Sequence, residues 1–210
     1  MNSLFQTAKI YPILDLDFCE KHNESIFSIL ELWNQYPNQI LFFQFRAKSI
    51  SSEEYKRLYL ELKKKASMPI LINDEFEIAV SESAFGLHLG KEDFANLDPK
   101  QRKEIQNSKI LVKGTSSHSI QDIKDLDISI WDYTGLGPIF KTNSKKSIYP
   151  SLGISILGEC LKVSKIPIVP IGGIDADNFE SVQACGNLIP ACISALNDKK
   201  IFFNLLDFIG

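Results

Sequence analysis

The sequence predicts an α/β protein: a single-domain (β/α)8 barrel (TIM barrel) that spans residues 1–210. Three observations favour this fold. Short β-branched or aromatic runs alternate with helical patterns, which implies parallel strands joined by right-handed crossovers. The alternation occurs eight times, the number that closes such a barrel. No linker rich in Pro, Gly or Ser divides the chain, and no G-x-G-x-x-G follows the first strand, so an open doubly wound sheet is disfavoured.

The first half of the chain contains four strand–helix units. Ser51 and Glu54 have the spacing of a capping box, and Pro99 suits the first turn of a helix. Apolar positions at helical spacing indicate the helices, and compact apolar runs indicate the strands. The expected strands are residues 9–14, 39–45, 69–72 and 85–89, and the expected helices are residues 23–35, 51–66, 75–83 and 98–107.

The second half repeats this alternation. Gly186 follows a helical pattern and is suited to end that helix. The longest expected loop, residues 135–153, is rich in Lys, Ser and Thr, and long loops in a compact domain are often functional. The expected strands are residues 109–112, 128–133, 167–171 and 188–193, and the expected helices are residues 119–126, 154–163, 175–185 and 199–208.

Composition excludes several classes of function. A chain of 210 residues with a net charge of -3 and a pI near 5.7 does not suit a general nucleic-acid or membrane-surface binder. No apolar run reaches the roughly 18 residues of a membrane span, and the N-terminal segment does not resemble a signal peptide. The four cysteines form no C-x-x-C pair, so we expect reduced thiols in a cytoplasmic protein. The oligomeric state stays open, a homo-oligomer included.

Polar residues follow the second expected strand, at the end where this fold keeps its active site. Gln44, Arg46 and Lys48 alternate with Phe45 and Ala47, so the three polar side chains share the face toward the barrel mouth. They form a candidate anion and hydrogen-bond site. The alternative is that the strand ends earlier and these side chains are solvated.

Two carboxylates follow the third and fourth strands, which are neighbours in the expected barrel. Asn73 and Asp74 could bind phosphate and Mg2+ respectively, or could cap a helix. Asp93 could complete a site for one hard cation together with substrate oxygens, or could likewise be a cap. We interpret His88 as a core histidine whose hydrogen bonds are satisfied.

Hydroxyls, lysines and glycines follow the later strands. The hydroxyls of residues 114–119 either reach a ligand or cap the next helix. Three lysines within residues 141–146 are either solvated or face an anionic substrate. Gly172, Gly173 and Ser194 follow the last two strands, whose loops form the usual phosphate site of such barrels through backbone N–H groups.

Seven segments carry motifs in a fixed order. They are Gln44–Lys48 (Q-x-R-x-K), Leu71–Asp74 (I-N-D), Gly86–Asp93 (G-V-H-L-G-Q-x-D), Gly114–Ser119 (G-x-S-x-H-S), Asp132–Lys145 (D-Y-x-G-x-G-P-x-F-P-T-x-T-K), Ile166–Ile174 and Ile193–Leu196. Together they resemble the thiamine-phosphate synthase family, whose relatives include thiazole tautomerases, from about Tyr11 to Leu196. Each motif alone is weak, but seven in order with matching spacing are specific.

The chain departs from the family pattern at a few positions. Lys91 stands where Gln is usual, Lys141 where Pro is usual and Ser144 where Thr is usual. The first strand ends in Leu14 and Asp15 rather than T-D. None of these departures removes a ligand type from the expected site.

The resemblance implies a Mg2+-dependent transferase. Its small-molecule substrates would be 4-amino-5-hydroxymethyl-2-methylpyrimidine diphosphate and hydroxyethylthiazole phosphate, and its products thiamine phosphate and pyrophosphate. By the same resemblance, Asp74 and Asp93 would hold the metal. The residues implied in catalysis are Arg46, Lys48, Ser116 and Lys145, and those implied in substrate binding are Gln44, Asn73, Thr142, Ser144, Gly173, Ile193 and Ser194.

Three alternatives remain. A thiazole tautomerase resembles this family but has a histidine where Pro138 stands here, which favours the transferase. A non-catalytic thiazole- or phosphate-binding barrel would be expected to lose the carboxylates or the loop cations, and both are present. An unrelated barrel isomerase would need a paired base and acid, for which Asp74, Asp93 and His88 are the candidates.

Overall fold

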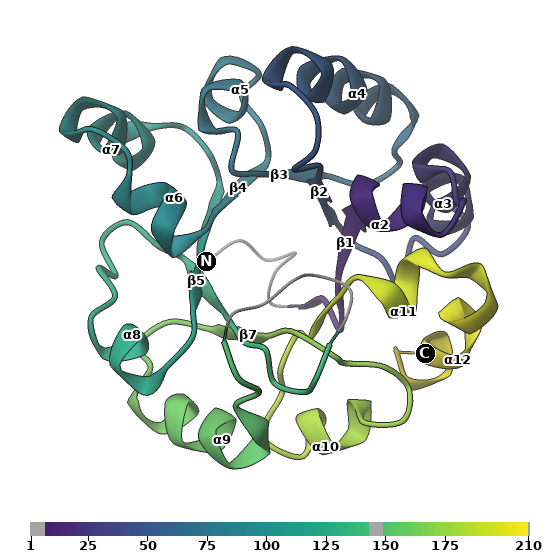
Figure 1. Cartoon of the computed structure of the whole chain (residues 1–210), viewed down its shortest axis with the longest axis vertical. Coiled ribbons are helices and arrows are strands. Elements are labelled where there is room, and N and C mark those ends of the chain that lie inside the picture. The colour runs from purple at the N-terminus through teal and green to yellow at the C-terminus, as the bar shows by residue number, and fades with distance from the viewer. Residues whose placement is uncertain (1–6, 143–148, 210) are drawn as a thin grey trace.

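Eight parallel strands form a ring that is surrounded by helices in the computed structural model, which describes residues 7–142 and 149–209 (Figure 1). The strand order is β7-β6-β5-β4-β3-β2-β1-β8, and a parallel bridge between Ile171 and Ala191 joins the two ends. The (β/α)8 barrel expected from the sequence is therefore confirmed.

The strands and helices alternate along the chain. The strands are β1 (Tyr11–Asp15), β2 (Phe43–Arg46), β3 (Ile70–Asn73), β4 (Gly86–Leu89), β5 (Val112–Ser117), β6 (Tyr133–Leu136), β7 (Ile168–Pro170) and β8 (Ala191–Cys192). The helices are α2 (Leu16–Lys21), α3 (Ile26–Trp33), α4 (Ser52–Lys65), α5 (Phe76–Ser81), α6 (Lys91–Ala95), α7 (Pro99–Asn107), α8 (Ile120–Lys124), α9 (Gly153–Val163), α10 (Phe179–Gln183), α11 (Ser194–Asn197) and α12 (Lys199–Ile209).

Two hydrophobic cores follow from the alternation of side chains along each strand. The larger core lies between the strands and the helices, and Phe45 packs there against Tyr55 of α4 with ring centroids 4.7 Å apart. The smaller core fills the barrel interior and includes Tyr11, Leu71 and Tyr133. Apolar side chains therefore close the interior, and the polar site is built above them.

Two strands begin later than the sequence predicts. β5 starts at Val112 and runs through Ser117, where residues 109–112 were expected, and β6 starts at Tyr133, where residues 128–133 were expected. The apolar run 128–130 lies in a turn instead, because the Asp127 carboxylate accepts hydrogen bonds from both the backbone N–H and the hydroxyl of Ser129. Small and polar residues form much of β5 because its inward face meets the Tyr133 ring.

Three short helices follow strands directly and were not predicted: α2 after β1, α6 after β4 and α11 after β8. The Asp15 side chain caps α2 by accepting a hydrogen bond from Phe18 N at 2.8 Å. The last strand is only two residues long, where residues 188–193 were expected, because Pro190 lacks an N–H and Ile193 already adopts helical backbone angles.

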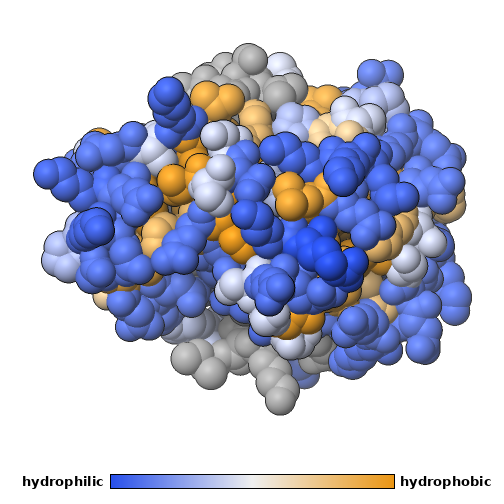
Figure 2. Space-filling view, turned by 90° about the horizontal axis from the view of Figure 1, so that it is seen from above, coloured by the Kyte–Doolittle hydropathy of each residue, from blue (hydrophilic) through white to orange (hydrophobic). Residues whose placement is uncertain are grey.

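The face of the molecule that Figure 2 shows is mostly hydrophilic. Viewed at right angles to Figure 1, it shows small, separate hydrophobic patches among polar side chains (Figure 2). Within the described ranges, every helix falls short of the length and hydrophobicity that crossing a bilayer requires.

Candidate active site

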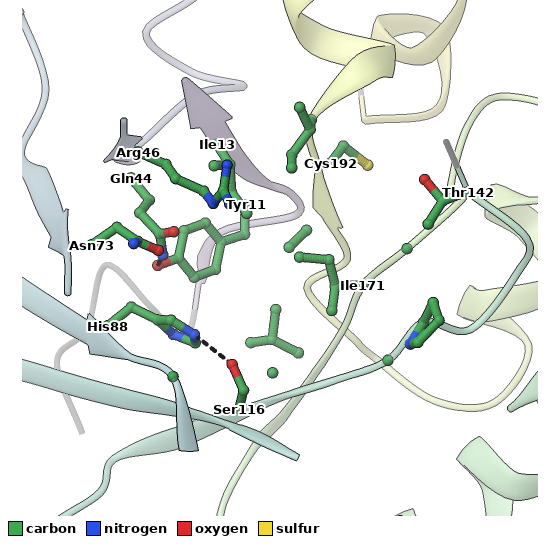
Figure 3. A pocket seen from close by; sticks show the side chains of 18 of the residues that line it. Tyr11, Ile13, Gln44, Arg46, Asn73, His88, Ser116, Thr142, Ile171 and Cys192 are labelled. Atoms are coloured by element: carbon green, nitrogen blue, oxygen red, sulfur yellow. Dashed lines mark hydrogen bonds between the residues drawn. The ribbon is translucent and has the colours of Figure 1, made fainter. Parts of the chain in front are cut away.

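A cavity of about 410 Å³ opens at the carboxyl ends of the strands (Figure 3). All predicted site residues that the structure describes line it, and they come from every part of the chain. These residues are Gln44, Arg46, Lys48, Asn73, Asp74, Asp93, Ser116, Thr142, Gly173, Ile193 and Ser194. The other two predicted residues, Ser144 and Lys145, lie outside the described residues.

The Arg46 guanidinium is held in place by a buried carboxylate. Its Nη1 lies 2.5 Å from Asp15 Oδ2, and the Asp15 side chain is only 1% exposed. Asp17 adds a second, longer contact of 3.7 Å. Because Asp15 sits on β1, the neighbour of β2, this ion pair orients Arg46 at the end of its strand and toward the cavity (Figure 3). The side-chain alternation expected for Gln44, Arg46 and Lys48 is confirmed.

Asp74 and Asp93 face each other across the mouth of β3 and β4. Lys48 contacts Asp74 and lies 3.6 Å from Asp93 Oδ2. Asp74 Oδ1 also accepts a hydrogen bond from Gly90 N at 3.1 Å. The capping alternative is not what the structure shows for Asp74, because Glu75 is the N-cap residue of α5 and no side chain caps that helix.

The two carboxylates have opposite pKa shifts. Burial acts to raise the pKa of Asp74, but the Lys48 ammonium outweighs it and the pKa lies below its usual value. Burial, and then the negative charge of Asp74, raise the pKa of Asp93. Two close carboxylates that oppose each other's ionisation are a donor set that suits a hard divalent cation.

The protein alone would not complete such a metal site. Among residues 7–142 and 149–209, no group of three or more His, Cys, Asp or Glu side chains is arranged to hold a metal ion. An ion held by Asp74 and Asp93 would therefore need further oxygen ligands from a substrate or from water.

A chain of hydrogen bonds crosses the barrel beneath the cavity mouth. Gln44 Nε2 donates to the Tyr11 hydroxyl at 2.8 Å, and the hydroxyls of Tyr11 and Tyr133 lie 2.7 Å apart. The Tyr133 hydroxyl lies 2.9 Å from His88 Nδ1, and His88 Nε2 lies 3.0 Å from Ser116 Oγ. The last of these bonds is drawn in Figure 3. Five side chains from five strands thus form one connected network.

The serine hydroxyls of residues 114–119 have three different roles: lining the cavity, capping a helix and bonding within the barrel wall. Ser116 lines the cavity, whereas Ser119 caps α8 by accepting a hydrogen bond from Asp122 N. Ser117 is buried in the barrel wall, where its hydroxyl lies 2.8 Å from that of Thr134. Both expected alternatives therefore apply, each to a different residue.

The rim of the cavity includes an aromatic pair. The rings of His118 and Tyr149 stack with centroids 3.9 Å apart, and the Tyr149 hydroxyl donates to Glu92 Oε1 at 2.7 Å. His118 Nδ1 lies 2.7 Å from the carbonyl oxygen of Gly137. These contacts hold the long loop, at Gly137 and Tyr149, against the carboxyl ends of β4 and β5.

Gly172 and Gly173 are required by the neighbouring loop. Their φ angles are 97° and 66°, a region that side chains disfavour. A Cβ on Gly172 would lie 2.6 Å from Pro138 Cβ, and one on Gly173 would lie 2.5 Å from the carbonyl oxygen of Lys141. The two glycines therefore let the β7 and β6 loops pack closely at the cavity wall.

The comparisons with known proteins cover most of the barrel. The family model described as thiamine monophosphate synthase matches residues 10–196, nearly the whole barrel. The chain belongs to the thiamine monophosphate synthase family. It is 34% identical over 166 residues to a thiamine-phosphate synthase from Latilactobacillus sakei, with 75% of this chain and 72% of that protein covered. It is 38% identical over 161 residues to one from Clostridium tetani, with 75% and 74% covered.

A solved structure shows that this fold is that of the thiamine monophosphate synthase family. The thiamine phosphate pyrophosphorylase from Pyrococcus furiosus is similar with a TM-score of 0.75 at 23% identity, and the match covers 99% of this chain and 98% of that one. The likeness extends over the barrel as a whole.

Sequence reasoning missed several cavity residues of this family member. His88 lines the cavity rather than the core, although both of its ring nitrogens lie within hydrogen-bond distance of partners, as the sequence predicted. Strand alternation could have found it, because Leu87 and Leu89 point to the outer core while His88 points inward. Tyr11 and Tyr133 gave no comparable signal, because a tyrosine in an apolar strand is normally a packing residue. Lys141 is exposed and does not belong to the cavity lining.

Proposed function

We propose that this protein is a thiamine-phosphate synthase. It joins 4-amino-5-hydroxymethyl-2-methylpyrimidine diphosphate to hydroxyethylthiazole phosphate, forming thiamine phosphate and releasing pyrophosphate. The observation that carries this proposal is the cavity itself. Cations, an amide and two carboxylates from β2, β3 and β4 meet at one mouth, in a chain that belongs to the thiamine monophosphate synthase family.

The reaction replaces diphosphate by the thiazole nitrogen at an exocyclic CH2 group. An electron-rich aminopyrimidine stabilises positive charge at that carbon, so departure of the diphosphate can precede attack. The protein then needs no strong base. It must neutralise the departing charge and hold the thiazole within reach of the carbon.

Arg46, Lys48 and Asn73 are placed to bind the diphosphate. Arg46 is pre-oriented by Asp15, so little side-chain entropy is lost when it meets an anion. Asn73 is 7% exposed and its amide contacts Asp74, which fixes its orientation at the end of β3. By family resemblance, Lys145 is a further diphosphate ligand.

Asp74 and Asp93 are the residues that would hold Mg2+. When bound, the ion would neutralise diphosphate oxygens and thereby favour their departure. Asp74 is fixed by Gly90 N and by Asn73, whereas Asp93 lies on the first turn of α6 and is more exposed. The pair therefore combines one rigid and one adjustable ligand.

The remaining cavity residues would orient the two rings. Gln44 would contact the pyrimidine, and Ser116, which also lines the cavity, would lie near the reacting carbon. By family resemblance, Thr142 and Ser144 would line the lid. Gly173, Ile193 and Ser194 would bind the thiazole phosphate through backbone groups, the mode common at this end of the barrel.

A coupled assay tests the proposal. Purified protein is incubated with both substrates and Mg2+, and thiamine phosphate is detected by fluorescence after oxidation. We expect product only when both substrates are present. An Arg46→Gln variant should lose most turnover, whereas Arg57→Gln, which changes an exposed arginine on α4, should keep it. Absence of product from folded wild-type protein would contradict the proposal.

The second candidate function is thiazole tautomerisation. The thiazole carboxylate phosphate isomer is supplied without any pyrimidine substrate, and its rearrangement is followed by absorbance or NMR. Because Pro138 occupies the position at the cavity that is histidine in tautomerases, we expect no rearrangement above background. Rapid rearrangement without coupling activity would reverse the assignment.

The wider biology follows from the same proposal. We infer a single-domain cytoplasmic enzyme that acts on small molecules and needs neither nucleic acid nor a membrane. All four cysteines are free thiols, as expected in a reducing compartment.

A further inference from the structure

The hydrogen-bond chain under the cavity has a phenol at its centre. The Tyr133 hydroxyl lies between the Tyr11 hydroxyl, at 2.7 Å, and His88 Nδ1, at 2.9 Å. The two ends of the chain, Gln44 and Ser116, line the cavity. Tyr133 therefore connects two cavity residues that lie on different strands, Gln44 on β2 and Ser116 on β5.

A hydroxyl carries a single hydrogen, so the direction of one bond in the chain constrains the next. Gln44 Nε2 donates to Tyr11, whose own hydrogen can then point to Tyr133. If Tyr11 donates to Tyr133 in this way, the Tyr133 hydrogen can point to His88 Nδ1, which accepts it only when the ring hydrogen is on Nε2. That ring hydrogen is donated to Ser116 Oγ, and the hydrogen of Ser116 is left to point into the cavity.

We propose that Tyr133 is a positioning residue that fixes the direction of this chain, so that His88 carries its hydrogen on Nε2 and Ser116 acts as a hydrogen-bond donor toward the cavity. The proposal deepens the proposed function and rests on it for the acceptor, an oxygen of the departing diphosphate. The reverse direction would make Ser116 donate to His88 and present only lone pairs to that anion.

Space for Tyr133 is provided by a glycine. A Cβ on Gly114 of β5 would overlap the Tyr133 ring, so the ring crosses the barrel only because this position has no side chain. The Tyr133 residue is 1% exposed, and burial raises the pKa of its hydroxyl well above the ordinary value. The phenol therefore keeps its hydrogen at neutral pH and can act as a donor.

The consequence is a donor that is aligned before substrate arrives. A pre-aligned hydroxyl pays no reorganisation cost when negative charge develops on the leaving oxygen. Removing the Tyr133 hydroxyl would let the His88 ring adopt either tautomer and let Ser116 turn. We expect the effect to appear in the chemical step, because the residues that bind the diphosphate are unchanged.

The first test measures the tautomer directly. In protein with 15N-labelled histidine, long-range 1H–15N NMR distinguishes a hydrogen on Nδ1 from one on Nε2. The chain has three histidines, and a His88→Gln variant assigns the signal. We expect the Nε2–H form in wild type and a mixture, or the Nδ1–H form, in Tyr133→Phe. A Nδ1–H form in wild type, or an unchanged tautomer in Tyr133→Phe, would overturn the proposal.

The matched control is Tyr59→Phe. Tyr59 is as buried as Tyr133 but lies on α4, outside the barrel interior. The Tyr59→Phe variant therefore shows what removing a buried tyrosine hydroxyl does by itself. It should leave the His88 signal and the turnover unchanged. A comparable change in the His88 signal with Tyr59→Phe would show that the response is only structural.

The second test is a double-mutant cycle on turnover. Tyr133→Phe should lower kcat by about 10-fold to 100-fold, with little change in KM for either substrate, the order for weakening one transition-state contact. In a Ser116→Ala background, Tyr133→Phe should lower kcat no further, because the Ser116 hydroxyl that Tyr133 positions is absent. Fully multiplicative losses would contradict the proposed coupling. The NMR test needs no turnover, so failure of the synthase assignment and failure of this inference are distinguishable.

Discussion

Gly114 shows how a single missing side chain determines what the barrel interior contains. Tyr133 occupies the space beside it and brings its hydroxyl to His88 and Tyr11. We predict that Gly114→Ala destabilises the protein by about 1–3 kcal/mol, the usual cost of overpacking a core. The free energy of unfolding in urea measures this change.

The control for that variant is Gly158→Ala on α9. A Cβ at Gly158 would meet nothing within 4 Å, so the substitution should stabilise the helix by about 0.5–1 kcal/mol. The same change in the free energy of unfolding for both variants would contradict the proposal that the Tyr133 ring needs the space at position 114.

The carboxylate pair leads to a second residue-scale prediction. Asp74→Asn or Asp93→Asn should lower turnover by at least about 100-fold, and excess chelator should abolish turnover of the wild type. The measurement is initial rate against Mg2+ concentration. Asp207→Asn changes an exposed carboxylate on α12 and should keep the wild-type curve. Full activity in excess chelator would exclude the metal assignment.

At this scale, the sequence predicted charges better than hydroxyls. Arg46 ends β2, and Lys48 and Asp74 lie just beyond β2 and β3, so their positions at the strand ends place them at the cavity. The role of Tyr11 depends on Tyr133, which is 122 residues away, and no local pattern reports such a partner. The support of Arg46 by Asp15 was missed for the same reason, since it crosses from β1 to β2.

At the scale of the elements, the helices α6 and α8 are linked by an ion pair between Lys91 and Asp122. Asp122 accepts a hydrogen bond from Lys91 Nζ at 2.6 Å and another from His118 N at 2.7 Å. Burial acts to raise the pKa of Asp122, but these two donors outweigh it and the pKa lies below its usual value. The ionised form is therefore the one that stabilises the fold.

This contact predicts a pH dependence of stability. Because the folded-state pKa is lowered, the contribution of Asp122 is present above the unfolded pKa of about 3.9 and is lost as the pH falls through the folded value. Asp122→Asn should cost about 1 kcal/mol at pH 7, and the difference from wild type should narrow below about pH 4. Urea unfolding at several pH values tests this, with the exposed Asp125→Asn as control. A difference in the free energy of unfolding between wild type and Asp122→Asn that does not change with pH would contradict this prediction.

Element type was easier to predict than element boundaries. Helices with capping signals, such as α4 after Ser51 and α7 after Asp98, agree closely with the structure. The strands β5 and β6 were placed too early because an apolar run was taken as the strand. In a barrel the inward face also takes glycine and serine wherever a large side chain fills the interior from the other side, as Tyr133 does.

At the scale of the whole molecule, the barrel is closed by a weaker seam. Within residues 7–142 and 149–209, β7 and β8 are joined by the single bridge between Ile171 and Ala191, whereas the other neighbouring strands pair over two to four residues. We predict that backbone amides at this seam exchange with deuterium faster than those of β3 and β4. Hydrogen exchange followed by mass spectrometry checks the order. Equal protection around the ring would show that the seam is not the weakest point.

The fold was predictable as a whole because eight repeats of one alternation leave few other topologies. The residues that close the ring were not predictable, because the bridge between Ile171 and Ala191 joins segments whose sequence gives no pairing signal. The same holds for the cavity: which strand ends bear polar residues could be predicted, but how their side chains pair across the barrel could not.

The buried Asn197 has a consequence for how the protein is made. Its side-chain oxygen accepts a hydrogen bond from Asp15 N at 3.3 Å, and its amide donates to the carbonyl oxygen of Ile13 at 2.7 Å, across 182 and 184 residues of chain. At roughly 5–20 residues per second, a ribosome needs about 10–35 s to produce this partner after the first strand has been made. Until then, the strand end that bears Asp15 lacks this support. A nascent chain that stops before Asn197 contains the charged residues that line the cavity, but not the contact that supports the backbone of Asp15, the partner of Arg46.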